Sequence, residues 1–534
     1  MSAVLSIRDL AVRFATPDGV VPAVNEFSFE LAPGECVGIV GESGAGKSQS
    51  FLAVMGLLAA NASVSGSARL GDTELLGNDR QALNAVRGSK LAMIFQDPMT
   101  SLTPHLRVVD QIGESLVRHR GFSKAQARQR ALELLQLVQV TDAERRLDQY
   151  PHELSGGMRQ RVMIALAMAR EPALLVCDEP TTALDAHVQE EILELIQKLQ
   201  KQHGTAVLFI THDLGVVKRI ADRVCVLWKG VAVESGTALD VLNRPQHPYT
   251  RGLLASRPPV DARPYPLPTV SDFLESRPVA SQEWPRRAAD AQAVPLLRAE
   301  GLVKSFSGPV LRSVDLEIYP GETVGLVGES GSGKSTLARC LVNLEHPDGG
   351  SLWWKGQPAQ QAVPRSERAK RIQYIFQDPF SSLPPHRTVG QILEEPLQVH
   401  RWAPTAKERE DRVVELLTRV GLQPADRHKY PHQFSGGQRQ RVGIARALAV
   451  EPELLLCDES VSALDVSVQA QVLNLLNELK QQMGFSILFI SHDLRVVQYM
   501  ADRLLVLRHG VWDAQGDPVS LLHHPTTPYL RQLS

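Results

Sequence analysis

The sequence predicts an α/β fold that is built twice along one chain of 534 residues. A glycine-rich loop at residues 41–48, Gly-Glu-Ser-Gly-Ala-Gly-Lys-Ser, reappears at 328–335 with one change. Three later motifs also recur in the same order, each 280 residues after its first copy. Short apolar runs of strand type precede these motifs, and a helical pattern follows each glycine-rich loop. We therefore expect two tandem domains of the same architecture.

The chain is long enough for two ordinary hydrophobic cores and a connector. We predict domains at residues 1–256 and 296–534, joined by a proline-rich linker at 257–295. Proline at this density is typical of an extended connector without a core of its own. Such a segment could span several tens of ångströms, at roughly 3 Å per residue.

Each copy opens with an alternating apolar segment, at residues 5–10 and 296–302. Phe14 matches Phe306, and the offset then shortens by five residues before the glycine-rich loops. The first copy therefore carries an insertion around residues 16–19, where Thr-Pro-Asp-Gly predicts the turn of a hairpin.

The glycine-rich loops follow apolar strands at 37–40 and 324–327 and open helices, which is the context of a phosphate-binding loop. Glycines let backbone N–H groups converge on phosphate oxygens, and the helix N-terminus adds partial positive charge. The lysines should reach the β- and γ-phosphates, and the following serines should offer a hydroxyl to Mg²⁺. The predicted nucleotide-binding residues are Gly41, Glu42, Ser43, Gly44, Ala45, Gly46, Lys47, Ser48 and Gln49, with Gly328, Glu329, Ser330, Gly331, Ser332, Gly333, Lys334, Ser335 and Thr336.

An amphipathic helix is expected downstream in each copy, before the Ser-Gly-Gly motif. Both helices begin with a capping-box pattern, Ser123-x-x-Gln126 and Thr405-x-x-Glu408. We interpret this region as a helical subdomain inserted into the α/β core.

Two buried parallel strands, at residues 173–178 and 453–458, end in carboxylates. Because ligands of open α/β sheets bind at the carboxyl ends of strands, Asp178 and Asp458 are placed to bind Mg²⁺ through water. Glu179 and Glu459 follow directly and are suited to orient or deprotonate an attacking water.

A third strand pattern in each copy, at 206–211 and 485–491, leads to His212 and His492. A single histidine after a strand is more often structural than catalytic. Its recurrence at the same offset favours contact with the γ-phosphate instead.

Together these motifs resemble the ABC ATPase cassette: Walker A loop, Gln loop, signature (Leu154-Ser-Gly-Gly-Met158, Phe434-Ser-Gly-Gly-Gln438), Walker B motif with glutamate, and His switch. The resemblance implies two P-loop domains, each with a RecA-like core, an antiparallel β subdomain and a helical signature subdomain. It also implies head-to-tail pairing, with each ATP held between the Walker motifs of one cassette and the signature of the other. The residues it adds are Gln96 and Gln377 as catalytic and Mg²⁺-contacting groups, Ser155, Gly156, Gly157, Ser435, Gly436 and Gly437 at phosphate, Phe14 and Phe306 at adenine, and Asp185 and Asp465 between the sites.

Phe14 could equally belong to the core, since aromatic residues are mostly buried. Met158 stands where the signature usually has glutamine, and Ser460 stands where the first copy has Pro180. Neither change removes a charged group that catalysis needs, so two competent sites are expected.

The segments after the Gln loops (residues 94–104 and 375–385) and the cassette tails (246–254 and 524–533) resemble the oligopeptide/dipeptide/nickel importer ATPases. The fused form is similar to Yej-type peptide and microcin C importers and to glutathione importers. This implies ATP hydrolysis with Mg²⁺, two permease subunits and an extracytoplasmic solute-binding protein. Relatives often carry an iron–sulfur site after the first tail, but this region has no cysteine, so no cluster is expected.

Composition restricts the alternatives. The net charge of −2 provides no positive field that would indicate binding to nucleic acid. No apolar run reaches the roughly 18 residues that a membrane-spanning helix needs, and no signal peptide is evident. We therefore expect a peripheral protein on the cytoplasmic face of the inner membrane. The main alternative is a soluble ABC-F ATPase acting on ribosomes, which the proline-rich linker disfavours because those proteins usually have charged helical linkers. The scattered cysteines oppose a zinc-bearing excision-repair ATPase, and the paired glutamates oppose a non-hydrolysing regulator.

Overall fold

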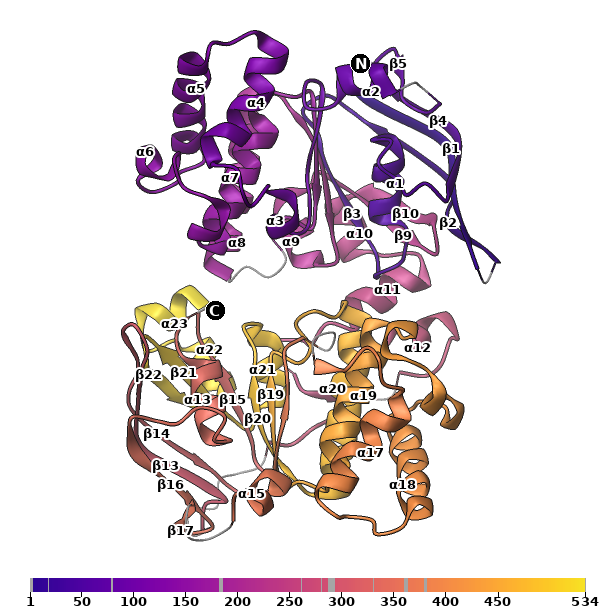
Figure 1. Ribbon diagram of the computed structural model, residues 1–534. Coiled ribbons are helices and arrows are strands. Elements are labelled where there is room, and N and C mark those ends of the chain that lie inside the picture. The colour runs from indigo at the N-terminus through magenta and orange to yellow at the C-terminus, as the bar shows by residue number, and fades with distance from the viewer. Residues whose placement is uncertain are drawn as a thin grey trace. The chain divides into compact units, whose positions relative to one another are not determined.

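The computed structural model describes residues 3–17, 19–77, 80–181, 186–260, 262–279, 281–286, 293–329, 331–359, 364–378 and 382–533. Its contacts divide the chain into two units, Met1–Leu254 with Phe273–Ser276, and Ala255–Asp272 with Arg277–Ser534. Both copies of the predicted α/β fold are thus present (Figure 1). The domain limits drawn from the sequence differ from these units around the linker and stay a prediction.

A six-stranded sheet forms the centre of each unit. The strand orders are β10-β9-β3-β8-β7-β6 and β18-β19-β20-β15-β21-β22, and only the edge strands β10 and β22 run antiparallel to their neighbours. The strands predicted to carry the motifs are buried throughout, as expected for parallel strands covered on both faces. The bounds in the first unit are β3 Cys36–Val40, β6 Leu91–Ile94, β7 Leu174–Asp178, β8 Ala206–Thr211, β9 Arg223–Trp228 and β10 Val231–Thr237; in the second they are β15 Thr323–Val327, β18 Ile372–Ile375, β19 Leu454–Asp458, β20 Ser486–Ile490, β21 Arg503–Arg508 and β22 Val511–Gly516.

An antiparallel sheet accompanies each core, in the orders β2-β1-β4-β5 and β14-β13-β16-β17. The insertion predicted in the first copy is a hairpin, because β1 and β2 pair as far as Thr16 opposite Gly19. In the second unit the corresponding pairing ends at Ser305 opposite Pro309. The strands are β1 Leu5–Thr16, β2 Gly19–Leu31, β4 Ala62–Leu70 and β5 Thr73–Glu74, and β13 Leu297–Ser305, β14 Pro309–Ile318, β16 Gly349–Trp354 and β17 Gln357–Pro358.

The helical part of each unit lies on the other side of the central sheet from the antiparallel sheet (Figure 1). Both predicted capping boxes are present, with Ser123 and Thr405 accepting from the N–H three residues on. The helices of this part are α3 Pro98–Ser101, α4 Val108–Arg120, α5 Lys124–Leu137, α6 Ala143–Arg146 and α7 Gly156–Met168, and α17 Val389–Val399, α18 Ala406–Arg419 and α19 Gly436–Leu448.

The remaining helices cover the sheets or form the tails. In the first unit they are α1 Lys47–Val54, α2 Arg80–Val86, α8 Ala186–His203, α9 Leu214–Ile220, α10 Ala238–Asn243 and α11 Pro248–Ala255; in the second they are α13 Lys334–Leu341, α15 Arg365–Arg371, α20 Val466–Met483, α21 Leu494–Met500, α22 Pro518–His523 and α23 Pro528–Leu533. Within the described ranges, none of the helices is both long and apolar enough to cross a membrane.

The proline-rich segment differs from the extended connector that its composition predicts. It contains a two-stranded ribbon, β11 Pro264–Tyr265 with β12 Gln282–Glu283, and the short helix α12 Val270–Leu274. Leu267 is 1% exposed and belongs to the hydrophobic core of the second unit. Arg263 is 2% exposed and donates to the carbonyl oxygens of Tyr499 and Met500 and to the carboxylate of Asp502. Proline content alone could not reveal this packing, because it depends on individual side chains such as Arg263, Leu267 and Val270 that are buried between more exposed residues.

Candidate functional site

The glycine-rich loops join the central strands to α1 and α13, as predicted. Gly46 and Gly333 precede these helices at φ 96° and 107°, a left-handed conformation that favours glycine. A Cβ on Gly46 would collide with the backbone carbonyl of Ala23. No side chain caps the first turn of either helix. The loop therefore fits a phosphate group, which needs close backbone approach and available N–H donors.

Each loop lysine is curled over its own loop. Lys47 Nζ donates to the carbonyl oxygens of Gly41 and Glu42 at 2.7 and 3.0 Å, and it is 5% exposed. Lys334 repeats this arrangement with Gly328 at 2.7 Å and Glu329 at 2.8 Å. A buried ammonium beside the loop supplies the positive charge that the sequence assigned to the phosphates.

A serine hydroxyl and a carboxylate meet beside each loop, as the metal assignment requires. Ser48 Oγ donates to Asp178 Oδ1 at 2.8 Å, and Ser335 Oγ donates to Asp458 Oδ1 at 3.2 Å. Burial raises the pKa of Asp178, although the Ser48 hydrogen bond opposes this effect. Hydroxyl and carboxylate oxygens are ligands that Mg²⁺ prefers, so the donor set fits this ion.

The two glutamates after the strands adopt the same unusual backbone conformation. Both Glu179 and Glu459 have a φ of 47°, in the left-handed region that residues other than glycine rarely occupy. Their N–H groups donate to the carbonyl oxygens of Ile210 and Ile490 at 2.9 Å, which holds the strained peptides against β8 and β20. Strain of this kind is often found at active sites, where the fold fixes a side chain in a required direction.

A glutamine and a histidine contact each of these glutamates. Gln96 Nε2 donates to Glu179 Oε2 at 2.9 Å, and His212 Nδ1 lies 3.2 Å from Glu179 Oε1. In the first unit the structure therefore brings together three side chains from three motifs. Burial disfavours the charged form of His212, but the hydrogen bond to Glu179 and the charge of its carboxylate outweigh burial, and the pKa of the imidazole is raised.

The second unit repeats this cluster with one difference. Gln377 Nε2 and His492 Nδ1 both approach Glu459 Oε2, at 2.9 and 3.5 Å. The hydrogen bond to Glu459 raises the pKa of His492, and the same contact lowers the pKa of Glu459. In each unit a carboxylate is therefore paired with an imidazole, and this contact favours the protonated, charged form of the imidazole.

The signature serines lie at helix N-termini, where anions are favoured. Ser155 caps α7 and Ser435 caps α19, each accepting an N–H from the residue three positions on. In the second unit Gln438 Oε1 also accepts the Ser435 N–H at 3.0 Å, whereas Met158 at the matching position has no amide oxygen to do so. The unusual signature residue therefore changes the cap of α7 and leaves its serine and glycines in place.

The two adenine candidates differ in exposure. Phe306 is 59% exposed, with Lys304 Nζ 5.2 Å from its ring centroid. Phe14 is partly buried and packs against the core of the first unit. This environment agrees with the alternative that Phe14 is a core residue. The described structure therefore favours Phe306 over Phe14 as a side chain available for stacking.

The motifs did not predict a contact between the tails and the glycine-rich loops. Tyr249 in α11 is fully buried, and its hydroxyl accepts the Glu42 N–H at 2.9 Å. Tyr529 in α23 accepts the Glu329 N–H at 2.7 Å. The two tyrosines stand 280 residues apart, the same offset as the other motifs, and this repeat was the signal that could have identified them. The tails are therefore connected directly to the predicted phosphate-binding loops.

Two predicted residues, Ser330 and Asp185, lie outside the described ranges. Asp465 caps α20 by accepting the Val468 N–H.

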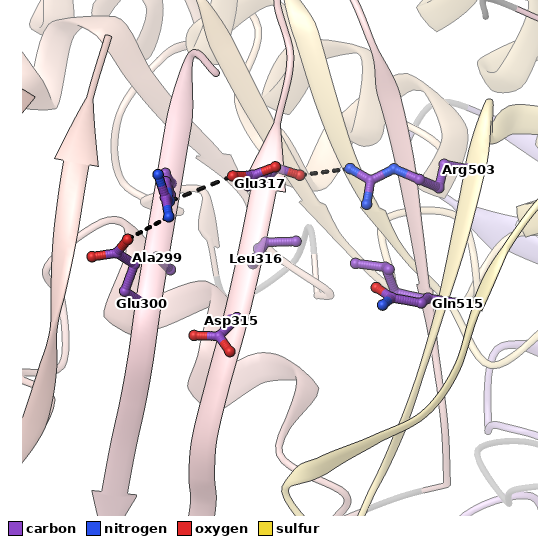
Figure 2. A pocket seen from close by; sticks show the side chains of 9 residues that line it. Ala299, Glu300, Asp315, Leu316, Glu317, Arg503 and Gln515 are labelled. Atoms are coloured by element: carbon purple, nitrogen blue, oxygen red, sulfur yellow. Dashed lines mark hydrogen bonds and ion pairs between the residues drawn. The ribbon is translucent and has the colours of Figure 1, made fainter. Parts of the chain in front are cut away.

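A separate pocket of about 430 Å³ between the antiparallel sheet and β21–β22 contains none of the predicted site residues (Figure 2). Three of its charged side chains pair with each other, Arg298 with Glu300 and Glu317.

Comparison with known proteins places this geometry in a family. Residues 24–182 and 311–462 match the ABC transporter family, and residues 233–276 match the C-terminal region of oligopeptide/dipeptide transporters. The chain is 46% identical over 534 residues to the peptidoglycan transport ATP-binding protein YejF of Agrobacterium fabrum, covering 99% of this chain and 95% of that protein. It is 43% identical over 558 residues to the glutathione import ATP-binding protein GsiA of Escherichia coli K12, covering 99% and 89%.

The first family matches the segments that carry both phosphate-binding loops and both Walker B strands, and the second matches the tail that contains Tyr249. The chain therefore belongs to the ABC transporter family, as a fused two-cassette ATP-binding protein of the oligopeptide/dipeptide group.

Proposed function

We propose that this protein hydrolyses ATP with Mg²⁺ at two sites and thereby drives import of peptides or peptide-like solutes through permease subunits. The main support is the cluster of Glu179, Gln96 and His212, repeated at Glu459, beside a buried lysine and a serine–aspartate pair. The substrate class rests on the oligopeptide/dipeptide match and on the names of the two relatives.

In the proposed chemistry the loop N–H groups and Lys47 bind the phosphates. Ser48 and Asp178 would hold Mg²⁺, which would supply positive charge to the phosphate oxygens. Glu179 orients the attacking water and accepts its proton. His212 and Gln96 fix the direction of this carboxylate through the hydrogen bonds given above. The same roles fall to Lys334, Ser335, Asp458, Glu459, His492 and Gln377 in the second cassette.

We further propose that each site is completed by the signature of the other cassette. Ser435 with Gly436 and Gly437 would complete the Lys47 site, and Ser155 with Gly156 and Gly157 the Lys334 site. The transferring phosphoryl group needs donors on all sides, and one glycine-rich loop covers only part of it. Phe306, and with less support Phe14, would stack on adenine.

Two permease subunits would provide the path across the membrane, and an extracytoplasmic binding protein would deliver the solute to them. The protein would then associate peripherally with the cytoplasmic face of the inner membrane. Closure of the cassettes on ATP would reach the permeases through the Gln96 and Gln377 loops, where the preceding residues Phe95 and Phe376 are 38% and 40% exposed.

Co-expression with candidate permease subunits tests the proposed function. We expect the protein to sediment with membranes only when these permeases are present, and its ATPase rate to rise when the binding protein and a peptide are added. Sedimentation with ribosomes and no response to the permeases would contradict the proposal and support the ABC-F alternative.

Site-resolved trapping tests the composite sites. Ser435→Arg should abolish vanadate trapping of an azido-ATP analogue in the first cassette, because the arginine would block the donors facing the Lys47 site. Binding to the Lys334 loop should remain, and Ser155→Arg should give the converse pattern. Loss of trapping only in the cassette that carries the mutated serine would refute completion by the opposite signature.

A further inference from the structure

The two Walker B aspartates have different hydrogen-bond partners. Asp458 accepts from Ser335 through Oδ1 at 3.2 Å and from the hydroxyl of Tyr374 through Oδ2 at 2.5 Å. Tyr374 lies on β18 and is 9% exposed, and Asp458 is 5% exposed. A buried carboxylate in the second cassette is therefore held at both of its oxygens.

A third side chain supports this contact from the solvent side. Arg339, an exposed residue of α13, approaches the phenol of Tyr374 and opposes burial and Asp458, which raise the pKa of this phenol. Because a guanidinium only donates, it can bond only to the phenol oxygen, and the phenol proton is left for Asp458. Hydrogen bonds in such a series polarise and strengthen one another.

The first cassette has apolar residues at both positions. Met93 pairs with Val176 in the same register in which Tyr374 pairs with Leu456. Leu52 follows Lys47 by the same five positions that separate Arg339 from Lys334. Neither methionine nor leucine can donate a hydrogen bond to a carboxylate. The Arg–Tyr–Asp series is thus specific to the second cassette.

We propose that Tyr374, supported by Arg339, is a positioning residue that fixes the Asp458 carboxylate for the divalent cation, so that the second cassette binds this cation more tightly than the first. This inference rests on the proposed role of Asp178 and Asp458 at the cation. A carboxylate has about four lone-pair sites, so an oxygen that accepts from a hydroxyl can still accept from a cation-bound water. A carboxylate already fixed at both oxygens need not be reoriented when the cation binds.

Manganese binding to the full-length chain, followed by the electron paramagnetic resonance of free Mn²⁺ with a non-hydrolysable ATP analogue, tests the inference. Lys47→Ala confines nucleotide binding to the second cassette, and Lys334→Ala confines it to the first. We expect a lower Mn²⁺ dissociation constant for the second cassette. In that background Tyr374→Phe should raise the constant roughly tenfold, because the freed carboxylate must then be oriented when the cation binds.

Matched variants separate the possible failures. Met93→Phe, in the Lys334→Ala background, should leave Mn²⁺ binding unchanged, because no hydroxyl is lost. Asp458→Asn in the Lys47→Ala background should weaken binding more than Tyr374→Phe does. An unchanged constant in Tyr374→Phe, with weakening in Asp458→Asn, would overturn the positioning role and keep the metal assignment. An unchanged constant in Asp458→Asn would overturn the metal assignment itself.

Arg339→Leu, which keeps the phenol, is the second variant and does not alter a buried residue. It should raise the Mn²⁺ dissociation constant of the second cassette by a smaller factor, roughly threefold, because it weakens the Tyr374 bond without removing it. Thermal unfolding confirms that each variant is folded. If Tyr374→Phe does not fold, an unchanged constant in Arg339→Leu overturns the proposal, as would equal Mn²⁺ affinity of the two cassettes.

Discussion

The two cassettes share the groups that would perform hydrolysis and differ in the groups around them. In both cassettes the lysine, serine, aspartate, glutamate, glutamine and histidine contact the corresponding partner residues, and the distances between the contacting atoms are similar. The surroundings differ at the Walker B aspartate (Tyr374 against Met93), at the signature cap (Gln438 against Met158) and at the packed linker, most of which belongs to the second unit. The motifs alone therefore predict two equivalent sites, whereas the side chains next to them predict that the two sites bind the divalent cation unequally.

Removing the glutamates should have the largest effect. Glu179→Gln with Glu459→Gln should lower the ATPase rate about 10²–10⁴-fold and leave ATP binding intact, because it removes the proposed base and spares the phosphate loops. Steady-state ATPase assays and ATP binding to the isolated protein measure the two effects. If the cassettes are equivalent, the two single variants should lose equal activity; near wild-type activity in the double variant would refute both assignments.

The packed linker should stabilise only the second cassette. Arg263→Met removes the hydrogen bonds to the carbonyl oxygens of Tyr499 and Met500 and to Asp502. Asp502 keeps Lys480 as a cationic partner at 3.2 Å, so the loss should be about 1–3 kcal/mol, the cost of unsatisfied buried acceptors. Because the chain has two units, unfolding should be followed with a probe in each. The transition of the first cassette is the internal control and should not move; equal loss in both would show that they unfold as one.

The tail tyrosines should affect nucleotide affinity symmetrically. Tyr249→Phe and Tyr529→Phe each remove one hydrogen bond to a loop N–H and keep the ring, so each should weaken ATP binding at its own site by about 1 kcal/mol, or roughly fivefold. Azido-ATP labelling of each cassette measures the effect. Thr250→Val, beside Tyr249, serves as the control, because the buried Thr250 hydroxyl makes no hydrogen bond within the described part of the chain. Loss at both sites from one substitution would indicate coupling between cassettes.

The smallest effect should be the pH dependence of the His492–Glu459 pair. The pKa of His492 is raised from 6.5 and that of Glu459 is lowered from 4.5. The contact therefore contributes most to the free energy of unfolding between pH 4.5 and pH 6.5, the ordinary pKa values of the two groups. Its contribution is lost as pH rises through the raised histidine pKa, and again as pH falls through the lowered glutamate pKa. His492→Gln should thus destabilise the second cassette more at about pH 6 than at about pH 9. An equal loss at both would exclude this ion pair.

The repeated motifs predicted the fold and most of the site because they describe local requirements. A glycine at φ 96° before a helix, a carboxylate ending a buried strand and a serine cap all follow from neighbouring residues. Tyr374, Arg339 and Arg263 could not be predicted in this way. Each acts across strands or helices distant in sequence, and Tyr374 and Arg339 have apolar counterparts in the first copy. Register between strands, which decides such contacts, is not specified by a local pattern.

The packed linker also determines where the gene can be divided. A recombinant second half that starts at residue 296, the boundary that composition predicts, would lack Arg263 and Leu267. The surface that Leu267 covers would face solvent, and exposed apolar surface of this kind favours aggregation. A second half that starts at residue 255 would keep both side chains and should remain soluble as a separate polypeptide.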